Sequence, residues 1–286
     1  MSSKILFLAA ATLLAADYQS SIAQWRADRE MRLKADDGWL TVVGLDWLKA
    51  GDNRVGSNPD FEVPLPKPAP ERVGVITVAN GKARFKPEPG IPVTLNGKPS
   101  TATELKPDTD PHYDVLAIGA VKFYVIQRED KLAVRIKDNH SAARREFTGL
   151  RWYPVDPSWK IQAKFVPYDK PRTLTFATAV GVKEQDESPG YVTFARSGKE
   201  YRLDPVIDDN ELWFVMRDAT SGKSTYAASR FLYAEMPKNG VVELDFNKAE
   251  NPPCVFTDFA TCPLPPPQNR LSLAVTAGEQ MYGNHH

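Results

Sequence analysis

The chain has 286 residues, of which 36 are basic and 36 acidic, and 42% are hydrophobic. A formal net charge of zero removes the electrostatic basis for binding nucleic acid or an anionic membrane surface, so we expect neither partner. The apolar fraction is sufficient for a sizeable core and excludes a chain that is disordered throughout. The 24 prolines and 17 glycines, spread along the chain, favour many short strands over long helices.

The first sixteen residues are typical of a secretory signal peptide. Lys4 supplies a positive charge, and the apolar run over residues 5–16 is shorter than the about 20 residues that span a bilayer. We therefore expect cleavage after Ala16, export to the periplasm or the extracellular space, and no transmembrane span. Cleavage after Ala23 fits the small-residue rule better, but it would cut into an expected helix. An uncleaved apolar helix that anchors the chain in a membrane is the alternative.

The first predicted elements after the signal peptide are a helix and a series of hairpins. Residues 18–34 carry Ile22, Trp25, Met31 and Leu33 among many charges, which predicts an amphipathic helix. The next segment alternates in the manner of a hairpin, with its turn at residues 50–53. Two more hairpins are predicted at the dipeptides Asn80-Gly81 and Asn96-Gly97, because Asn-Gly pairs accept the positive φ angles of tight turns.

The remaining strands are predicted from alternating apolar residues and Gly-containing turns. Breaks are expected at Gly119, Glu129-Asp130, Ser197-Gly198 and Ser221-Gly222, with a strand in residues 241–247 and a final strand in 270–279. This spacing predicts an all-β, mainly antiparallel fold with an N-terminal amphipathic helix. We expect a first domain over residues 17–150, with the helix and a β-sandwich, and a second, β-barrel-like domain over 151–286.

Cys254 and Cys262 are the only cysteines. In an exported protein a close, even pair is most simply a disulfide, here closing a proline-rich loop. A metal site, a catalytic thiol and two reduced thiols are the alternatives. Two thiols without a second ligand pair nearby are weak evidence for a metal, so we expect no metal and no cofactor.

Three segments carry a family resemblance: GLRWYPVDPSWKIQAKF (149–165), MRDATSGKSTYAASRFLYAEMP (216–237) and LDFNKAENPPCVFTDFATCPLPPPQNRLSLAVTAGE (244–279). They resemble the uncharacterised bacterial family called domain of unknown function 1684, with similarity that starts near Tyr18. The resemblance implies a fold and no known activity.

A weaker resemblance lies in the N-terminal half. NRVGSNPDFEVPLP (53–66), followed by TLNGKP (94–99), resembles the forkhead-associated β-sandwich. In such domains an Arg, a Ser and an Asn bind a phosphothreonine, and Arg54 and Ser57 are the matching residues here. The usual Ser-x-x-His stretch is absent, so we expect the fold without phosphopeptide binding.

Polar residues gather in two neighbouring β-segments of the second domain. Asp245 and Asn247 are two apart on a predicted strand and should share a face, and Arg230 could form a bidentate ion pair with Asp245. One interpretation is a pocket for a small polar or anionic ligand, and the other is a buried network that fixes the loop. The candidate ligand-binding residues are Arg135, Asp138, Asp218, Thr220, Thr225, Tyr226, Arg230, Asp245, Asn247, Asn251, Asn269 and Glu279.

Other charged clusters are weaker candidates. Arg135, with Arg144 and Arg145, could line an anion site, or these could be solvated loop charges. Adjacency of Asp138, His140 and Ser141 does not make a catalytic triad, which requires convergence in space. Glu279 could pair with Arg230 or act as a general acid.

Three functions therefore follow as hypotheses from the sequence. The first is an exported protein that binds a small polar or anionic ligand. The second is a hydrolase that uses a carboxylate pair or a bound metal. The third is a structural envelope-interaction protein without a pocket.

Overall fold

The computed structural model describes residues 2–178, 181 and 183–283, with side chains from Ala16 onwards. It divides into two compact units. Unit 1 comprises residues 1–32, 148–255 and 261–286, and unit 2 comprises residues 33–147 and 256–260. Mainly antiparallel sheets with a long N-terminal helix confirm the predicted fold class.

Unit 2 is built from two sheets with the strand orders β1-β11-β10-β9-β6-β7 and β3-β2-β4-β5-β8. Its strands are β1 (Val42–Trp47), β2 (Gly51–Gly56), β3 (Val63–Pro64), β4 (Gly74–Ala79), β5 (Lys82–Pro87), β6 (Thr94–Leu95), β7 (Lys98–Pro99), β8 (Thr103–Leu105), β9 (Leu116–Ile118), β10 (Val121–Arg128) and β11 (Lys131–Asp138), with a short helix α2 (Ala142–Arg145). One core cluster includes residues of both sheets, and Phe85 contacts Phe123 edge-on with ring centroids 6.0 Å apart. The two sheets therefore pack as a sandwich. Its likeness to a forkhead-associated domain stays a prediction.

The Asn-Gly hairpins of unit 2 are confirmed. Asn80 and Gly81 connect β4 to β5 with φ angles of 52° and 73°, and Asn96 and Gly97 connect β6 to β7 with 49° and 79°. Two successive positive φ angles are the conformation that a two-residue type I′ turn requires.

The hairpin predicted around residues 50–53 is wrong. Strand β1 pairs with β11, whereas β2 pairs with β3 and β4, so the chain passes from one sheet to the other between Trp47 and Gly51. Alternation shows that a segment has two faces, but it does not identify the neighbouring strand.

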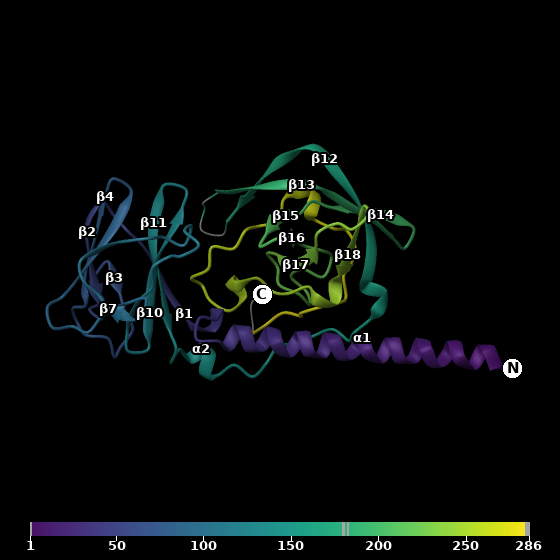
Figure 1. Ribbon diagram of the computed structural model, residues 1–286, viewed down its shortest axis with the longest axis horizontal. Coiled ribbons are helices and arrows are strands. Elements are labelled where there is room, and N and C mark those ends of the chain that lie inside the picture. The colour runs from purple at the N-terminus through teal and green to yellow at the C-terminus, as the bar shows by residue number, and fades with distance from the viewer. Residues whose placement is uncertain (1, 179–180, 182, 284–286) are drawn as a thin grey trace. The chain divides into compact units, whose positions relative to one another are not determined.

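Unit 1 contains the helix α1 (Ser2–Lys34) and two further sheets, with the strand orders β14-β13-β12-β18 and β15-β16-β17. Its strands are β12 (Lys160–Ala177), β13 (Lys183–Arg196), β14 (Lys199–Leu203), β15 (Val206–Asp208), β16 (Glu211–Met216), β17 (Arg230–Glu235) and β18 (Val241–Asp245), with 3₁₀ turns η3 (Phe246–Lys248), η4 (Pro253–Val255) and η5 (Pro267–Asn269). The long strands β12 and β13 arch over β15, β16 and β17 (Figure 1). A register shift between Pro167 and Arg172 interrupts their pairing, as expected where a bulge bends a strand.

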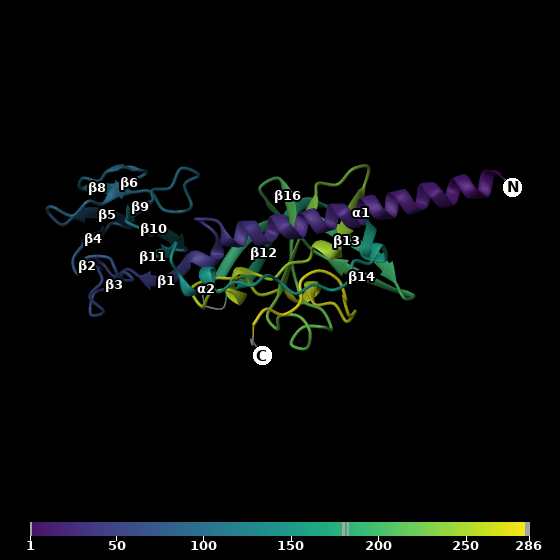
Figure 2. The same ribbon diagram turned by 90° about the horizontal axis from the view of Figure 1, so that it is seen from below.

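Most of helix α1 belongs to unit 1, whereas the sequence predicts it in the sandwich domain. Ile22 is fully buried, and Trp25 contacts Trp152 edge-on with ring centroids 5.8 Å apart. Figures 1 and 2 both show α1 alongside the strands of unit 1. Met31 is 61% exposed, so its predicted place on the apolar face is wrong. Among the described residues, no helix has both the length and the apolar character needed to cross a bilayer.

The final strand predicted over residues 270–279 is also wrong. This segment forms only isolated bridges, between Arg217 and Arg270 and between Trp152 and Glu279. Several of its carbonyl groups instead accept hydrogen bonds from one buried side chain, that of Arg230.

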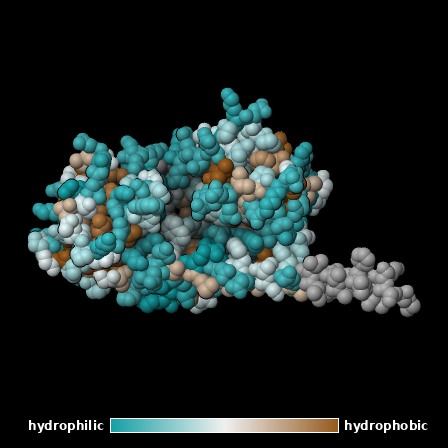
Figure 3. Space-filling model, viewed as in Figure 1, coloured by the Kyte–Doolittle hydropathy of each residue, from teal (hydrophilic) through white to brown (hydrophobic). Residues whose placement is uncertain are grey.

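On the face drawn in Figure 3, hydrophilic residues predominate and hydrophobic residues form small scattered groups.

Candidate functional site

Arg230, at the start of β17, is the centre of a buried polar network in unit 1. Its Nη1 donates to Asp218 Oδ2 at 3.0 Å and to the carbonyl of Val275 at 3.1 Å, and its Nη2 donates to the carbonyl of Ala277. The side chains of Arg230 and Asp218 are both 0% exposed. Asp218 Oδ1 also accepts from Thr220 Oγ1 at 2.6 Å. These groups bind each other and the C-terminal segment, and neither charged side chain reaches solvent.

The predicted ion pair between Arg230 and Asp245 is wrong. Asp245 Oδ1 accepts a hydrogen bond from the Tyr18 hydroxyl of α1 at 2.8 Å. Asn247 Nδ2 donates to the same hydroxyl at 3.0 Å and to the carbonyl of Asp156 at 2.8 Å. Asp245 and Asn247 do point together, but they hold the helix. Burial, followed by the hydrogen bond to Asp245, raises the pKa of Tyr18 well above its ordinary value.

Other predicted site residues hold loops in unit 1. Asn269 Nδ2 donates to the carbonyls of Asp204 and Val215 at 2.8 and 2.9 Å. The Thr225 hydroxyl is 2.8 Å from that of Thr220. Asn251 Nδ2 donates to the carbonyl of Gln280 at 2.8 Å. Such contacts match the structural alternative, a network that fixes loops.

Arg135 and Asp138 belong to unit 2, whereas the other ten predicted residues belong to unit 1. The Arg135 guanidinium lies 5.1 Å from the centre of the Trp39 ring. Asp138 Oδ1 accepts from the amide of His140 at 2.8 Å, a hydrogen bond that shapes the local turn. The ten predicted residues of unit 1 are divided among several separate hydrogen-bond networks.

Unit 1 does contain a cleft, with a volume of about 930 Å³, bounded by α1, β17 and β18. It is lined by Trp25, Arg32, Gln162, Glu211, Tyr233, Ala234, Glu235, Met236, Lys238, Val241, Glu243, Asp245, Lys248 and Glu250. Asp245 is the one lining residue among our predicted set. The signal that could have found others is the period of two in β17 and β18, where Tyr233 precedes Glu235 and Glu243 precedes Asp245.

Two glutamates share one arginine beside this cleft. Arg29 Nε lies 2.9 Å from Glu279 Oε1 and 3.2 Å from Glu250 Oε2. The Glu279 side chain is 0% exposed and that of Glu250, which lines the cleft, is 13% exposed. The predicted pairing of Glu279 with Arg230 is therefore wrong, although the Glu279 carbonyl lies 3.4 Å from Arg230 Nη2.

The environment of Glu250 favours its neutral form. Burial raises its pKa, Arg29 opposes this shift, and the neighbouring Glu279 raises it further, to about 7. A carboxyl with such a pKa exchanges its proton at neutral pH, which is a property of groups that act as acids or bases.

Most acidic side chains of the cleft already have partners. The ion pairs are Glu235 with Lys238 at 2.5 Å, Glu243 with Lys160 at 3.0 Å and Glu250 with Arg29 at 3.2 Å. Within the described part of the chain, Arg32 and Lys248 have no carboxylate at ion-pair distance. The cleft therefore presents two cations, Arg32 and Lys248, and two carboxylates, Glu211 and Asp245, that have no ion pair among the described residues.

Cys254 and Cys262 are both thiols in the structure. The Cys254 amide donates to Cys262 Sγ at 3.1 Å, and a hydrogen bond with Cys262 lowers the pKa of the Cys254 thiol, against the effect of burial. Tyr226, another predicted site residue, contributes to the same lowering. The expected proximity is present, and the disulfide itself stays a prediction.

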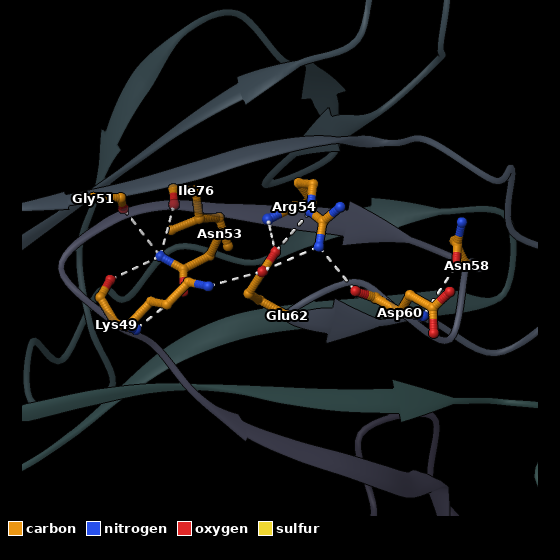
Figure 4. A network of polar contacts seen from close by, with 8 residues as sticks. All are labelled: Lys49, Gly51, Asn53, Arg54, Asn58, Asp60, Glu62 and Ile76. Carbon is orange, nitrogen blue, oxygen red and sulfur yellow. Dashed lines mark hydrogen bonds and ion pairs between the residues drawn. The ribbon is translucent and has the colours of Figure 1, made fainter.

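Arg54, the predicted counterpart of the phosphate-binding arginine of forkhead-associated domains, is engaged within unit 2 (Figure 4). Its Nε donates to Glu62 Oε2 at 3.0 Å, and Lys49 Nζ donates to Glu62 Oε1 at 2.9 Å. These two hydrogen bonds hold the pKa of Glu62 well below its ordinary value. Asn53 Nδ2 stabilises the neighbouring turn by donating to the carbonyl of Gly51. The carboxylate of Glu62 thus takes the place of an external anion.

Among the described residues, no group of three or more His, Cys, Asp or Glu side chains is arranged to hold a metal ion.

Comparisons with known proteins give a family and no activity. No curated protein matches the chain. A solution NMR structure of an uncharacterised protein from Haloarcula marismortui is 29% identical over 48% of this chain and 78% of that chain, with a TM-score of 0.41. The family model described as "Protein of unknown function (DUF1684)" matches residues 145–280, which confirms the resemblance over that range. Its extension towards Tyr18 stays a prediction. Residues 145–280 thus match the model of the DUF1684 family of proteins of unknown function.

Proposed function

We propose that unit 1 binds a small polar or anionic ligand in the cleft bounded by α1, β17 and β18. The observation that carries this proposal is the cleft itself, with a volume of about 930 Å³. Small-molecule sites commonly have volumes of about 300–1,000 Å³ and combine aromatic walls with a few polar groups. Trp25 and Tyr233 supply aromatic surface here, and Arg32 and Lys248 supply positive charge.

A thermal-shift and calorimetric screen tests this proposal. The probes are lactate and sulfate, which are anions, arginine, which carries a net positive charge, and N-acetylglucosamine, which is polar and neutral. Lys248→Met should weaken binding of an anionic probe at least about tenfold, the effect of losing about 1.4 kcal/mol. Lys199→Met, which removes an exposed lysine of β14 outside the cleft, is the matched control and should bind as the unaltered chain does.

If no probe shifts the melting temperature or produces a binding isotherm, the proposed function is wrong. If Lys248→Met and Lys199→Met bind equally well, the ligand binds elsewhere and the assignment of the cleft is wrong.

A second candidate is a hydrolase in which Glu250 acts as general acid or base. The observation that favours it is a carboxyl at the cleft wall with a pKa of about 7. The Glu279 side chain is 0% exposed, so it can orient Arg29 but does not face a substrate. Under this hypothesis one carboxyl, rather than a pair, performs the proton transfer.

The test is hydrolysis of chromogenic esters, glycosides and phosphate esters. Glu250→Gln should lower the rate about 10²–10⁴-fold, the usual contribution of a general acid or base. Glu200→Gln, which alters an exposed residue of β14, should retain the rate. Equal rates in the two variants would contradict the role of Glu250.

We also propose export with cleavage after Ala16. Two contacts support this site over the one after Ala23: Tyr18 donates a hydrogen bond to Asp245, and Ile22 is fully buried. Cleavage after Ala23 would remove both residues. Mass spectrometry of protein from the exported fraction of a bacterial host should give a chain that starts at Asp17. A start at Gln24, or an intact Met1, would contradict the proposal.

The disulfide between Cys254 and Cys262 is part of the same proposal, because export leads to an oxidising compartment. The close approach of the two cysteines supports it. The exported protein should contain no thiol that reacts with an alkylating reagent until it is denatured and reduced. Two reactive thiols in the denatured, unreduced protein would contradict it.

A further inference from the structure

At the wall of the cleft, two carboxylates contact a single guanidinium group. Glu250 and Glu279 both contact the single guanidinium of Arg29. The Glu279 side chain is less exposed than that of Glu250. It also makes a further hydrogen bond, because its Oε2 accepts from the Asn251 amide at 2.8 Å. If one of the two carboxylates takes up a proton, the enclosed group becomes neutral. Glu250, which borders the cleft, is the one with access to solvent protons.

The groups that face Glu250 come from three parts of unit 1. Arg29 and Arg32 belong to α1, Tyr233 belongs to β17, and Glu279 belongs to the C-terminal segment. None of these neighbours is a histidine. Arg29 is held by Glu279, and Tyr233 has a pKa raised by burial and by Glu250, so both keep their protonation state at neutral pH. Glu250 is therefore the group whose charge changes there.

We propose that the cleft is a proton-gated site for small organic or inorganic anions, which binds the anion while Glu250 carries a proton and releases it when Glu250 ionises. This inference rests on the proposed function and adds to it a ligand class and a mode of regulation. Arg32 and Lys248 would attract the anion. A neutral Glu250 can donate a hydrogen bond to it, whereas an ionised Glu250 can only accept hydrogen bonds and repels it.

Arg32 and Lys248 are the groups of the cleft that attract an anion, whereas Glu211 and Asp245, which line it without an ion pair among the described residues, oppose one. The carboxylates of Glu235 and Glu243 are each within 3.0 Å of a lysine ammonium group, so their negative charge is already neutralised. Arg32 and Lys248 have no such partner among the described residues. The pKa of Glu250, raised to about 7 by burial against the opposing effect of Arg29, would set the midpoint of the gate.

Calorimetric titration at constant ionic strength tests the gate directly. Lactate serves as the carboxylate probe and sulfate as the inorganic oxyanion, because neither changes its charge between about pH 5.5 and 8.5, far above the carboxylic pKa range. For the unaltered chain, Kd should rise at least tenfold across this interval, with a midpoint near 7. Glu250→Gln should bind equally well at both ends, and Glu200→Gln should retain the pH dependence.

A second measurement does not depend on the variants. At about pH 7.5, binding should be accompanied by uptake of a proton, detected by repeating the titration in two buffers of different ionisation enthalpy. Binding of lactate alone would assign a carboxylate ligand, and binding of sulfate alone would assign an inorganic or ester oxyanion; both support the inference.

The inference and the proposed function fail in different ways. Binding of N-acetylglucosamine or arginine without either anion would overturn the anion gate and leave the ligand-binding cleft intact. Anion binding that is independent of pH, or that strengthens as pH rises, would overturn the gate as well, as would an unchanged pH dependence in Glu250→Gln. If none of the four probes binds at any pH, both proposals are wrong.

Discussion

Two buried arginines of unit 1 have opposite charge environments. Arg230 faces one carboxylate, that of Asp218, together with backbone carbonyls, and both charged side chains are 0% exposed. Arg29 faces two carboxylates, and one of them, Glu250, borders a cleft. The first group is balanced and closed, as structural ion pairs are, whereas in the second two carboxylates contact one guanidinium, Arg32 lies beyond ion-pair distance, and one carboxylate has access to solvent. Charge balance therefore distinguishes a structural cluster from a candidate functional one better than polarity alone does.

The largest expected effect comes from breaking the balanced cluster. Arg230→Met leaves Asp218 buried without its cation, so we expect the free energy of unfolding to fall by about 3–5 kcal/mol. Urea denaturation of the variant measures this loss. Arg32→Met, an exposed position of α1 without an ion pair among the described residues, should change stability by less than about 0.5 kcal/mol. Similar losses in the two variants would show that the Arg230 network is not the stronger structural element.

Substitution of Gly278, in the C-terminal segment that contacts both arginine clusters, should lower the free energy of unfolding nearly as much. A Cβ atom at Gly278 would lie 2.3 Å from the carbonyl oxygen of Ala249, and Gly278 has a φ of +79°. Gly240 has a similar φ of +75°, but a Cβ atom there would have no neighbour within 4 Å, so Gly240→Ala is a control for the backbone term alone. We expect Gly278→Ala to cost about 1–3 kcal/mol more than Gly240→Ala in thermal or urea unfolding. Equal costs would mean that the segment moves aside easily.

The cluster of Arg29, Glu250 and Glu279 should make the free energy of unfolding depend on pH. The pKa of Glu250 is raised from 4.5 to about 7, so the folded chain binds more protons than the unfolded chain between these values. The contribution of this proton to stability should therefore be fully present below about pH 4.5 and be lost as pH rises through 7, by slightly more than about 3 kcal/mol at most, or about 1.4 kcal/mol for each pKa unit. Glu250→Gln should remove this part of the pH dependence, measured as the difference between the two unfolding profiles. Parallel profiles would contradict the assignment of the proton to Glu250.

The smallest of these effects concerns the attachment of α1. Tyr18→Phe removes the hydroxyl that joins Asp245 and Asn247, and we expect a loss of about 1 kcal/mol, the usual net contribution of a hydrogen bond. Tyr113→Phe, at a 38% exposed position of unit 2, should have no measurable effect. If Tyr18→Phe is equally neutral, burial of Ile22 and its apolar neighbours is sufficient to hold the helix.

Structure that forms between neighbouring residues was predictable from the sequence. The turns at Asn80-Gly81, Asn96-Gly97 and Ser197-Gly198 all connect paired strands, and each has two successive positive φ angles. A prediction of the same kind failed for residues 270–279, whose alternating apolar pattern resembles a strand. The carbonyl groups of Val275 and Ala277 accept hydrogen bonds from the Arg230 side chain rather than from a neighbouring strand, and no local pattern records such a partner.

The amino-acid sequence by itself determined the fold class, the positions of the tight turns and the polar character of the segments around Asp218, Asp245 and Glu279, because these depend on backbone preferences and on the alternation of side chains along a strand. Only the tertiary structure decided which charges meet. Arg29 and Glu279 are 250 positions apart in the chain, yet their atoms approach to 2.9 Å. An ion pair depends on distance in space and on burial, and folding sets both of these, so the cleft and the two carboxylates beside it come together only when α1 packs on the strands of unit 1.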